Sequence, residues 1–271
     1  QINQAIYSPK SPFGLIMASF GHWVGYSYLA LLSGFCFKFF LEEKTLWKKL
    51  ALLAIAGGSY VVPTWLSGKE VTSVNAYNMP KLTWLFVLLA AIIMFAMGYL
   101  GYKMGKKNDS QRILLAMIIL GVLIVIQLVP VAQVLKSTMR RPRYRVVADD
   151  AYGYQSIFLN WWQPYKDYKN FALANSDIAH LSENFKSFPS GHASVAAILI
   201  FGLPYLSLIE PKLKGKENLL FIIGLVFTIL MSFSRMLVGA HYLSDVSFGG
   251  LTMIICCIIA NEINLKFVLK D

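Results

Sequence analysis

The chain has 271 residues, of which 56% are hydrophobic and only 14% are charged, and its formal net charge is +11. A soluble domain has about half apolar and about a quarter charged residues, so this composition, with a mean hydropathy of +0.55, excludes a soluble globular protein. The basic residues lie in short clusters between apolar segments. That distribution is typical of membrane topology signals and argues against a nucleic-acid partner.

Seven apolar segments follow one another along the chain, each close to the length of about 20 residues that a membrane-spanning helix needs. They comprise roughly residues 14–41, 50–67, 82–104, 113–135, 191–209, 218–237 and 242–263. The sequence therefore predicts an all-α protein, a polytopic bundle of transmembrane helices. The first segment contains His22 and Lys38, so it either spans the bilayer or lies partly along the interface.

Lysine-rich stretches alternate with the apolar segments and predict the orientation of the chain. They are residues 42–50, 103–112, 210–218 and the tail 266–271. The positive-inside tendency places these stretches in the cytoplasm. The long loop 136–190 then lies on the extracytoplasmic side. We favour a bacterial inner (plasma) membrane, because no eukaryotic targeting signal is evident in the sequence.

The loop begins with a basic cluster on the side where topology rules do not expect one. Its cations are Lys136, Arg140, Arg141, Arg143 and Arg145. Guanidinium groups bind phosphate oxygens through two parallel hydrogen bonds, and a lysine acts as a point charge. The cluster indicates an anion site; the alternative is a solvated helix end or a contact with lipid headgroups.

The sequence Phe-Pro-Ser-Gly-His-Ala-Ser at 188–194 begins the fifth apolar segment. Ser190 is a natural helix cap, and the free N–H groups of a helix start attract anions. His192 lies in the first turn, where it could give a proton to a leaving oxygen. The alternative is an ordinary capped helix with an interfacial histidine.

The stretch 234–245 places Arg235, His241 and Asp245 next to an apolar segment. Asp245 lies four positions after His241, so on a helix they share one face. A hydrogen bond from one ring nitrogen to the carboxylate would fix the tautomer and leave the other nitrogen nucleophilic. The alternative is a buried Arg–Asp pair with a satisfied histidine.

Together these stretches resemble the type-2 phosphatidic acid phosphatases, also called lipid phosphate phosphatases. That family has the signatures K-x6-R-P, P-S-G-H and S-R-x5-H-x3-D. The second occurs here as Pro189 to His192, and the third begins at Ser234 and ends at Asp245. Lys136 and Arg143 fit the first, but Tyr144 stands in place of the proline. Arg141 precedes a proline and is the alternative; the spacing favours Arg143.

The resemblance covers about residues 82–263 and implies a core of six transmembrane helices. This chain would then consist of an additional N-terminal hydrophobic segment, residues 1–45, and a phosphatase core, residues 46–271, with the extracytoplasmic loop 136–190.

The resemblance also implies a mechanism. His241 would attack phosphorus and form a phosphohistidine, Asp245 would orient it, and His192 would be the general acid and then the general base. The phosphoryl oxygens would be held by Lys136, Arg143, Ser190, Gly191 and Arg235, with Arg141 as the alternative arginine. No acidic metal cage is visible, so we predict metal-independent activity without a cofactor.

The substrate class stays open within membrane lipids. Undecaprenyl diphosphate is favoured; phosphatidate, phosphatidylglycerol phosphate and transfer of the phosphoryl group to a second lipid are the alternatives. An anionic-lipid transporter or binding protein is the non-enzyme alternative, but it gives no reason for the His241–Asp245 spacing. His22, the region of His180 and the pair Cys256–Cys257 are expected to be structural.

Overall fold

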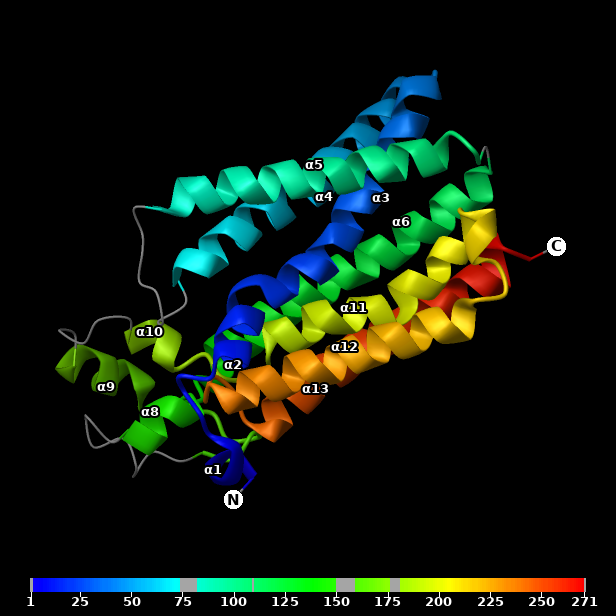
Figure 1. Ribbon diagram of the computed structural model, residues 1–271. Coiled ribbons are helices and arrows are strands. Elements are labelled where there is room, and N and C mark those ends of the chain that lie inside the picture. Colours follow the sequence, from blue (N-terminus) through cyan, green and yellow to red (C-terminus); the bar gives the residue numbers. More distant parts are fainter. Residues whose placement is uncertain (1, 74–81, 109, 150–158, 176–180, 271) are drawn as a thin grey trace.

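The computed structural model describes residues 2–73, 82–108, 110–149, 159–175 and 181–270, and within these ranges all regular structure is helical (Figure 1). Among these described residues, seven helical segments are long and apolar enough to cross a membrane: Pro12–Glu42, Leu46–Val71, Thr83–Gly105, Gln111–Ala148, Gly191–Leu208, Glu217–Leu237 and Leu243–Val268. The predicted all-α polytopic bundle is confirmed. His180 and residues 150–158 and 176–180 of the loop lie outside the described residues.

The first span is continuous, although the sequence left its course open. Helix α2 (Pro12–Ile16), the π-helical turn η1 (Met17–Gly21) and α3 (His22–Glu42) follow one another without a break. This span is the most buried of the seven. Helix α3 packs against α4 (Leu46–Ser73), α5 (Thr83–Gly105) and α11 (Gly191–Tyr205). The boundary expected at residue 45 therefore separates two helices that pack against each other.

Two glycines of α3 allow this central position. A Cβ atom on Gly34 would lie 1.6 Å from the carbonyl oxygen of Gly98 in α5, and one on Gly25 would lie 2.3 Å from that of Val195 in α11. Only glycine permits such close approach of helix backbones, a frequent solution where helices pack inside a bilayer. The N-terminal segment is thus built into the bundle.

Four further helices form the part of the bundle that carries the sequence motifs. Helix α6 (Gln111–Ile126) continues through the π-helical turn η3 (Gln127–Val131) into α7 (Ala132–Met139), while α12 (Glu217–Leu237) and α13 (Leu243–Ile263) lie beside α11. Gln127 is buried and donates hydrogen bonds to Ser194 (3.1 Å) and Thr252 (2.9 Å). This side chain fixes the mutual register of η3, α11 and α13.

The short helices gather at one end of the bundle (Figure 1). They are α1 (Ile2–Ile6), α8 (Tyr144–Asp149), α9 (Tyr168–Ala174) and α10 (Leu181–Asn184). The α5–α6 and α11–α12 connections and the C-terminus lie at the opposite end (Figure 1). The lysine-rich stretches 103–112 and 210–218 and the tail are therefore separated from the end that carries loop 136–190.

Candidate active site

Three helix ends meet at the end of the bundle that carries the short helices: the end of α7, the start of α11 and the turn between α12 and α13. The Oγ of Ser190 accepts a hydrogen bond from the N–H of Ala193 and so caps α11. The N–H of Ser190 donates to the carbonyl oxygen of Asp245 (3.0 Å), which ties α11 to α13. A Cβ on Gly191 would lie 3.4 Å from Lys136 Nζ, so the ammonium group lies beside the α11 N-terminus.

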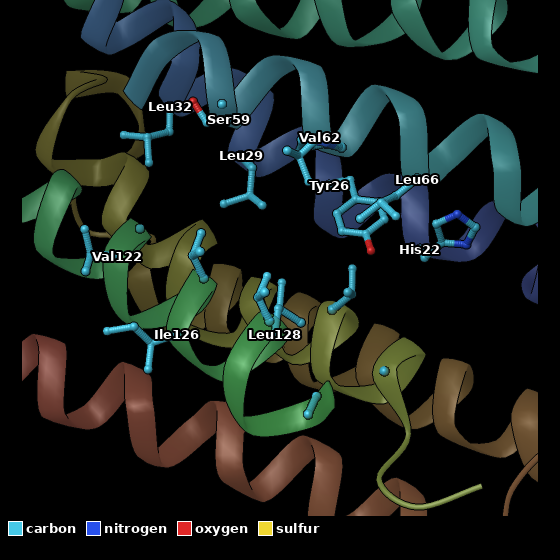
Figure 2. Close-up of a pocket in the computed structure, with 18 of the residues that line it drawn as sticks. His22, Tyr26, Leu29, Leu32, Ser59, Val62, Leu66, Val122, Ile126 and Leu128 are labelled. Atoms are coloured by element: carbon cyan, nitrogen blue, oxygen red, sulfur yellow. The ribbon is translucent and has the colours of Figure 1, made fainter. Parts of the chain in front are cut away.

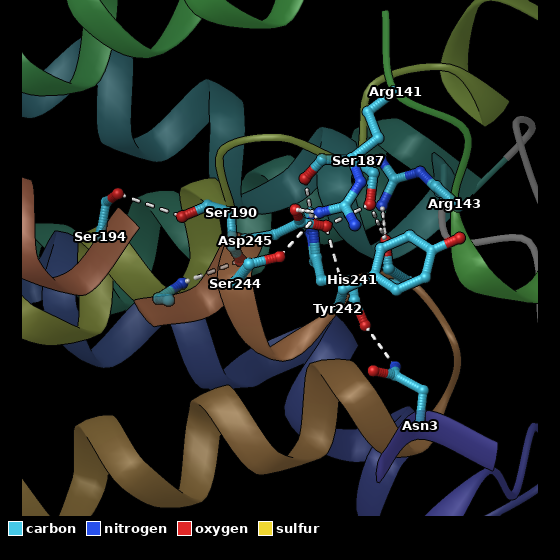
Figure 3. A network of polar contacts seen from close by, with 12 residues as sticks. Asn3, Arg141, Arg143, Ser187, Ser190, Ser194, His241, Tyr242, Ser244 and Asp245 are labelled. Carbon is cyan, nitrogen blue, oxygen red and sulfur yellow. Dashed lines mark hydrogen bonds and ion pairs between the residues drawn. The ribbon is translucent and has the colours of Figure 1, made fainter. Parts of the chain in front are cut away.

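Asp245 is the centre of a buried polar network (Figure 3). Its carboxylate forms an ion pair with Arg141 Nη1 and accepts hydrogen bonds from Ser187 Oγ (2.5 Å) and the N–H of Tyr242 (2.9 Å). Arg141 also donates to Ser244 Oγ (2.8 Å). Since Asp245 is 0% and Arg141 4% exposed, each charge depends on the other for compensation.

His241 is held by a backbone carbonyl. Its Nδ1 lies 2.6 Å from the carbonyl oxygen of Ser187, and the nearer Asp245 oxygen is 3.9 Å away. The hydrogen bond expected between His241 and Asp245 thus goes to Ser187, whose hydroxyl is held by Asp245. Because a carbonyl oxygen can only accept, Nδ1 carries the proton and Nε2 has the lone pair. Burial, and then the charges of Arg143, Arg235 and Lys136, lower the pKa of His241 well below its usual value.

Arg235 has donors without acceptors. Its side chain is buried, and among the described residues its Nε and Nη1 find no hydrogen-bond partner. Arg143 uses Nε for the carbonyl oxygen of Glu183 (2.8 Å) and Nη1 for that of Ala240 (3.1 Å). Buried donors are almost always satisfied in native proteins, so the unpaired nitrogens of Arg235 indicate a site for an anionic ligand.

His192 faces three residues that were not predicted to belong to the site: Ala18, Glu70 and His22. Its Nε2 lies 3.1 Å from the carbonyl oxygen of Ala18 and 3.7 Å from Glu70 Oε1. The ring of His22, which was expected to be structural, stands edge-on at 5.1 Å between ring centroids. A carboxylate near the end of an apolar span is a signal that could have pointed to Glu70; its proximity to His192 depends on the tertiary fold.

A cavity of about 720 Å³ extends from His192 into the membrane-spanning part of the bundle. Its polar end is lined by His22, Glu70, Lys136, Gly191 and His192. Its walls are mainly aliphatic side chains from α3, α4 and α6, among them Leu29, Leu32, Val62, Leu66, Val122 and Ile126 (Figure 2). A cavity with one polar end, where Lys136 lies, and hydrocarbon walls suits an amphipathic ligand.

The described part of the chain brings together no group of three or more His, Cys, Asp or Glu side chains able to hold a metal ion. The predicted metal independence concerns catalysis and stays a prediction.

A sequence model described as the PAP2 superfamily matches residues 110–268, which is more than half of the chain. The match includes every motif residue from Lys136 to Asp245 and confirms the resemblance read from the sequence. It begins after α5, so Glu70 and His22 lie outside it. No curated protein and no solved structure gives a match.

Proposed function

The chain belongs to the PAP2 superfamily, and from that premise we propose that it is a membrane lipid phosphatase that works through a phosphohistidine. Membership implies a phosphatase acting on phosphate esters, and the seven apolar helices indicate a multi-pass membrane protein. The lipid substrate, the chemistry of each residue and the membrane face are our proposals.

The observation that carries the lipid substrate is the cavity. Its volume of about 720 Å³ lies within the range of about 300–1,000 Å³ usual for ligand sites. Its aliphatic walls would hold a hydrocarbon chain, while the phosphoryl group would lie among Lys136, Arg143 and Arg235 and the α11 N-terminus. A polyprenyl diphosphate such as undecaprenyl diphosphate fits this division, and so do phosphatidate and phosphatidylglycerol phosphate.

In the first chemical step, the Nε2 lone pair of His241 attacks phosphorus and the bond to the lipid leaving oxygen breaks. Ser187 holds Nδ1–H, and Asp245 acts as a positioning residue through Ser187, with its charge 3.9 Å from the ring stabilising the developing imidazolium. His192, as imidazolium, gives its proton to the leaving oxygen. The cations and the N–H groups at Gly191 stabilise charge on the phosphoryl oxygens.

In the second step, water attacks phosphorus, neutral His192 accepts its proton, and the P–N bond breaks to release inorganic phosphate. A lipid hydroxyl or phosphate replacing that water would make the protein a phosphotransferase with the same residues. We propose that the site faces the extracytoplasmic side, because the lysine-rich connections α5–α6 and α11–α12 lie at the other end of the bundle (Figure 1).

The test follows phosphate release in detergent, with EDTA present, from long-chain and short-chain forms of the same lipid phosphates. We expect Val62→Trp, which fills the cavity from α4 (Figure 2), to raise KM for long-chain substrates by about tenfold, because a hydrocarbon chain then loses part of its apolar contact. KM for short-chain substrates should change little.

Val61→Trp is the matched control. Val61 is the adjacent valine on the same helix, is similarly exposed, and does not line the cavity. Equal effects of the two tryptophans, or equal effects on both chain lengths, would contradict a hydrocarbon chain in this cavity. Absence of phosphate release from every lipid would contradict the phosphatase proposal, and binding without release would favour the transporter alternative.

Replacing Arg235 should separate ligand binding from stability. Removing a buried cation with unpaired donors relieves a desolvation cost, so Arg235→Met should melt at the same or a higher temperature than the wild type. Inorganic phosphate should raise the melting temperature of the wild type and not that of Arg235→Met. Arg112→Met, which alters an exposed arginine bound to the Lys270 carbonyl, should respond to phosphate as the wild type does. A lowered melting temperature in Arg235→Met without phosphate would instead assign Arg235 a structural role.

A further inference from the structure

Two ionisable side chains from the N-terminal spans lie against His192. Glu70 comes from α4 and His22 from the start of α3, and both helices precede the residues that match the family. Glu70 Oε1 is 3.7 Å from His192 Nε2, and the rings of His22 and His192 stand at 80° with centroids 5.1 Å apart. Residues outside the family match therefore contact one side of His192, the histidine that we assign as the acid.

The hydrogen bond of His192 defines which of its nitrogens exchanges a proton. Nε2 lies 3.1 Å from the carbonyl oxygen of Ala18, which can only accept, so Nε2 carries a proton in the neutral ring. A second proton must then enter and leave at Nδ1. Glu70 stands on the Nε2 side, where it can balance the charge of the ring without competing for the mobile proton.

Most of the charged side chains around His192 are cations. The side chains whose charges face this histidine or its ring neighbours are His22, Glu70, Lys136, Arg143, Arg235 and His241. Asp245 is committed to Arg141, and Glu183 pairs with Lys186 at 2.5 Å. Glu70 interacts with the charges of Lys136, Arg143 and Arg235. A general acid surrounded by cations needs such a carboxylate to hold its proton.

We infer that Glu70 is a positioning residue of the reaction, which holds His192 as the imidazolium that protonates the leaving oxygen, with the edge of His22 fixing the plane of the ring. This inference rests on the proposed function. It also gives the N-terminal spans a part in the chemistry, since α3 and α4 bring His22 and Glu70 to the site.

Glu70→Gln keeps the size of the side chain and removes its charge. We expect kcat to fall by about tenfold with KM nearly unchanged, a fraction of the roughly 10²–10⁴ that a general acid contributes. His192 must be protonated for the first step, so the enzyme loses activity as the pH rises and His192 loses its proton. Without the carboxylate that loss should begin about one pH unit lower in kcat/KM, since a nearby charge shifts a titration by about that much.

Glu70→Asp should recover part of both kcat and the pH profile, because it restores the charge. Glu210→Gln is the matched control: it removes a carboxylate paired with Lys107, far from the site, and should leave both unchanged. A fall in kcat with an unmoved pH profile and no recovery in Glu70→Asp would reduce Glu70 to a structural residue and overturn the inference. So would a Glu70→Gln protein that behaves like the wild type.

A readout without turnover keeps this inference distinct from the proposed function. The four histidines can be labelled and titrated by NMR in micelles, with His192 assigned from the His192→Asn variant. We expect the His192 signal to titrate at lower pH in Glu70→Gln than in the wild type. An unchanged titration would overturn the coupling of Glu70 to His192. A wild type that shows the coupling but releases no phosphate would instead overturn the phosphatase proposal alone.

Discussion

His241→Asn should lower phosphate release by at least about 10⁴-fold, the scale on which loss of a covalent nucleophile acts. Asparagine keeps a side-chain N–H near the position of Nδ1, which can still donate to the Ser187 carbonyl, but it has no counterpart of Nε2. The cations Lys136 and Arg235 stay in place. The affinity for inorganic phosphate, measured as inhibition or as a rise in melting temperature, should therefore change little.

The phosphorylated intermediate is the decisive observation. Alkaline quenching of the wild type with ³²P-labelled lipid substrate should leave label on the protein that is stable in alkali and lost in acid, whereas His241→Asn should stay unlabelled. His192→Asn keeps the nucleophile but lacks the acid and the base. Its label should therefore form slowly and, once formed, be hydrolysed slowly. Label on His241→Asn and none on His192→Asn would exchange the two roles. Turnover by His241→Asn near the wild-type rate would exclude this histidine as the nucleophile.

The spans and the motif residues could be predicted because they depend on local sequence. Apolar runs of bilayer length identify helices whatever their partners, and Ser190 caps α11 as its position before an apolar run indicates. The grouping of Lys136, His192 and His241 at one end of the bundle follows from the alternation of the spans. These features need no knowledge of side-chain packing.

The pairing of charges could not be predicted, because it depends on the path of the chain between α7 and α11. Spacing favoured Arg143 over Arg141 as the phosphate ligand, but only the fold shows that Arg141 reaches Asp245 while Arg143 donates to two backbone carbonyls. Likewise Glu70 is over a hundred residues from His192, and their contact depends on how α3 fits between α4 and α11. Sequence spacing within one helix predicts neighbours; contacts between helices require the packed structure.

Arg141→Met should lower the free energy of unfolding by about 3–5 kcal/mol, the cost of leaving one partner of a buried ion pair uncompensated. The methionine keeps the length of the side chain. Among the described residues, the carboxylate of Asp245, which is 0% exposed, then keeps Ser187 and the Tyr242 N–H as donors. Denaturant titration in mixed micelles measures the change. Arg140→Met is the matched control, because Arg140 contacts the Ser137 carbonyl and the Tyr168 ring at the surface and should cost less than about 1 kcal/mol.

A double-mutant cycle measures how much the Arg141–Asp245 ion pair contributes to stability, separately from any role in phosphate binding. In Arg141→Met with Asp245→Asn the unpaired charge is gone, so the double variant should regain much of the stability lost in Arg141→Met, with a coupling of about 1–3 kcal/mol. Arg143→Met should show the opposite profile: a smaller loss of stability and a larger loss of phosphate affinity, because Arg143 donates to the carbonyls of Glu183 and Ala240 and forms no direct ion pair with Asp245. Weaker phosphate binding in Arg141→Met than in Arg143→Met, with the fold still stable, would make Arg141 the phosphate ligand. The arginine of the first signature would then be identified by the Arg141–Pro142 pair and not by its distance from Lys136.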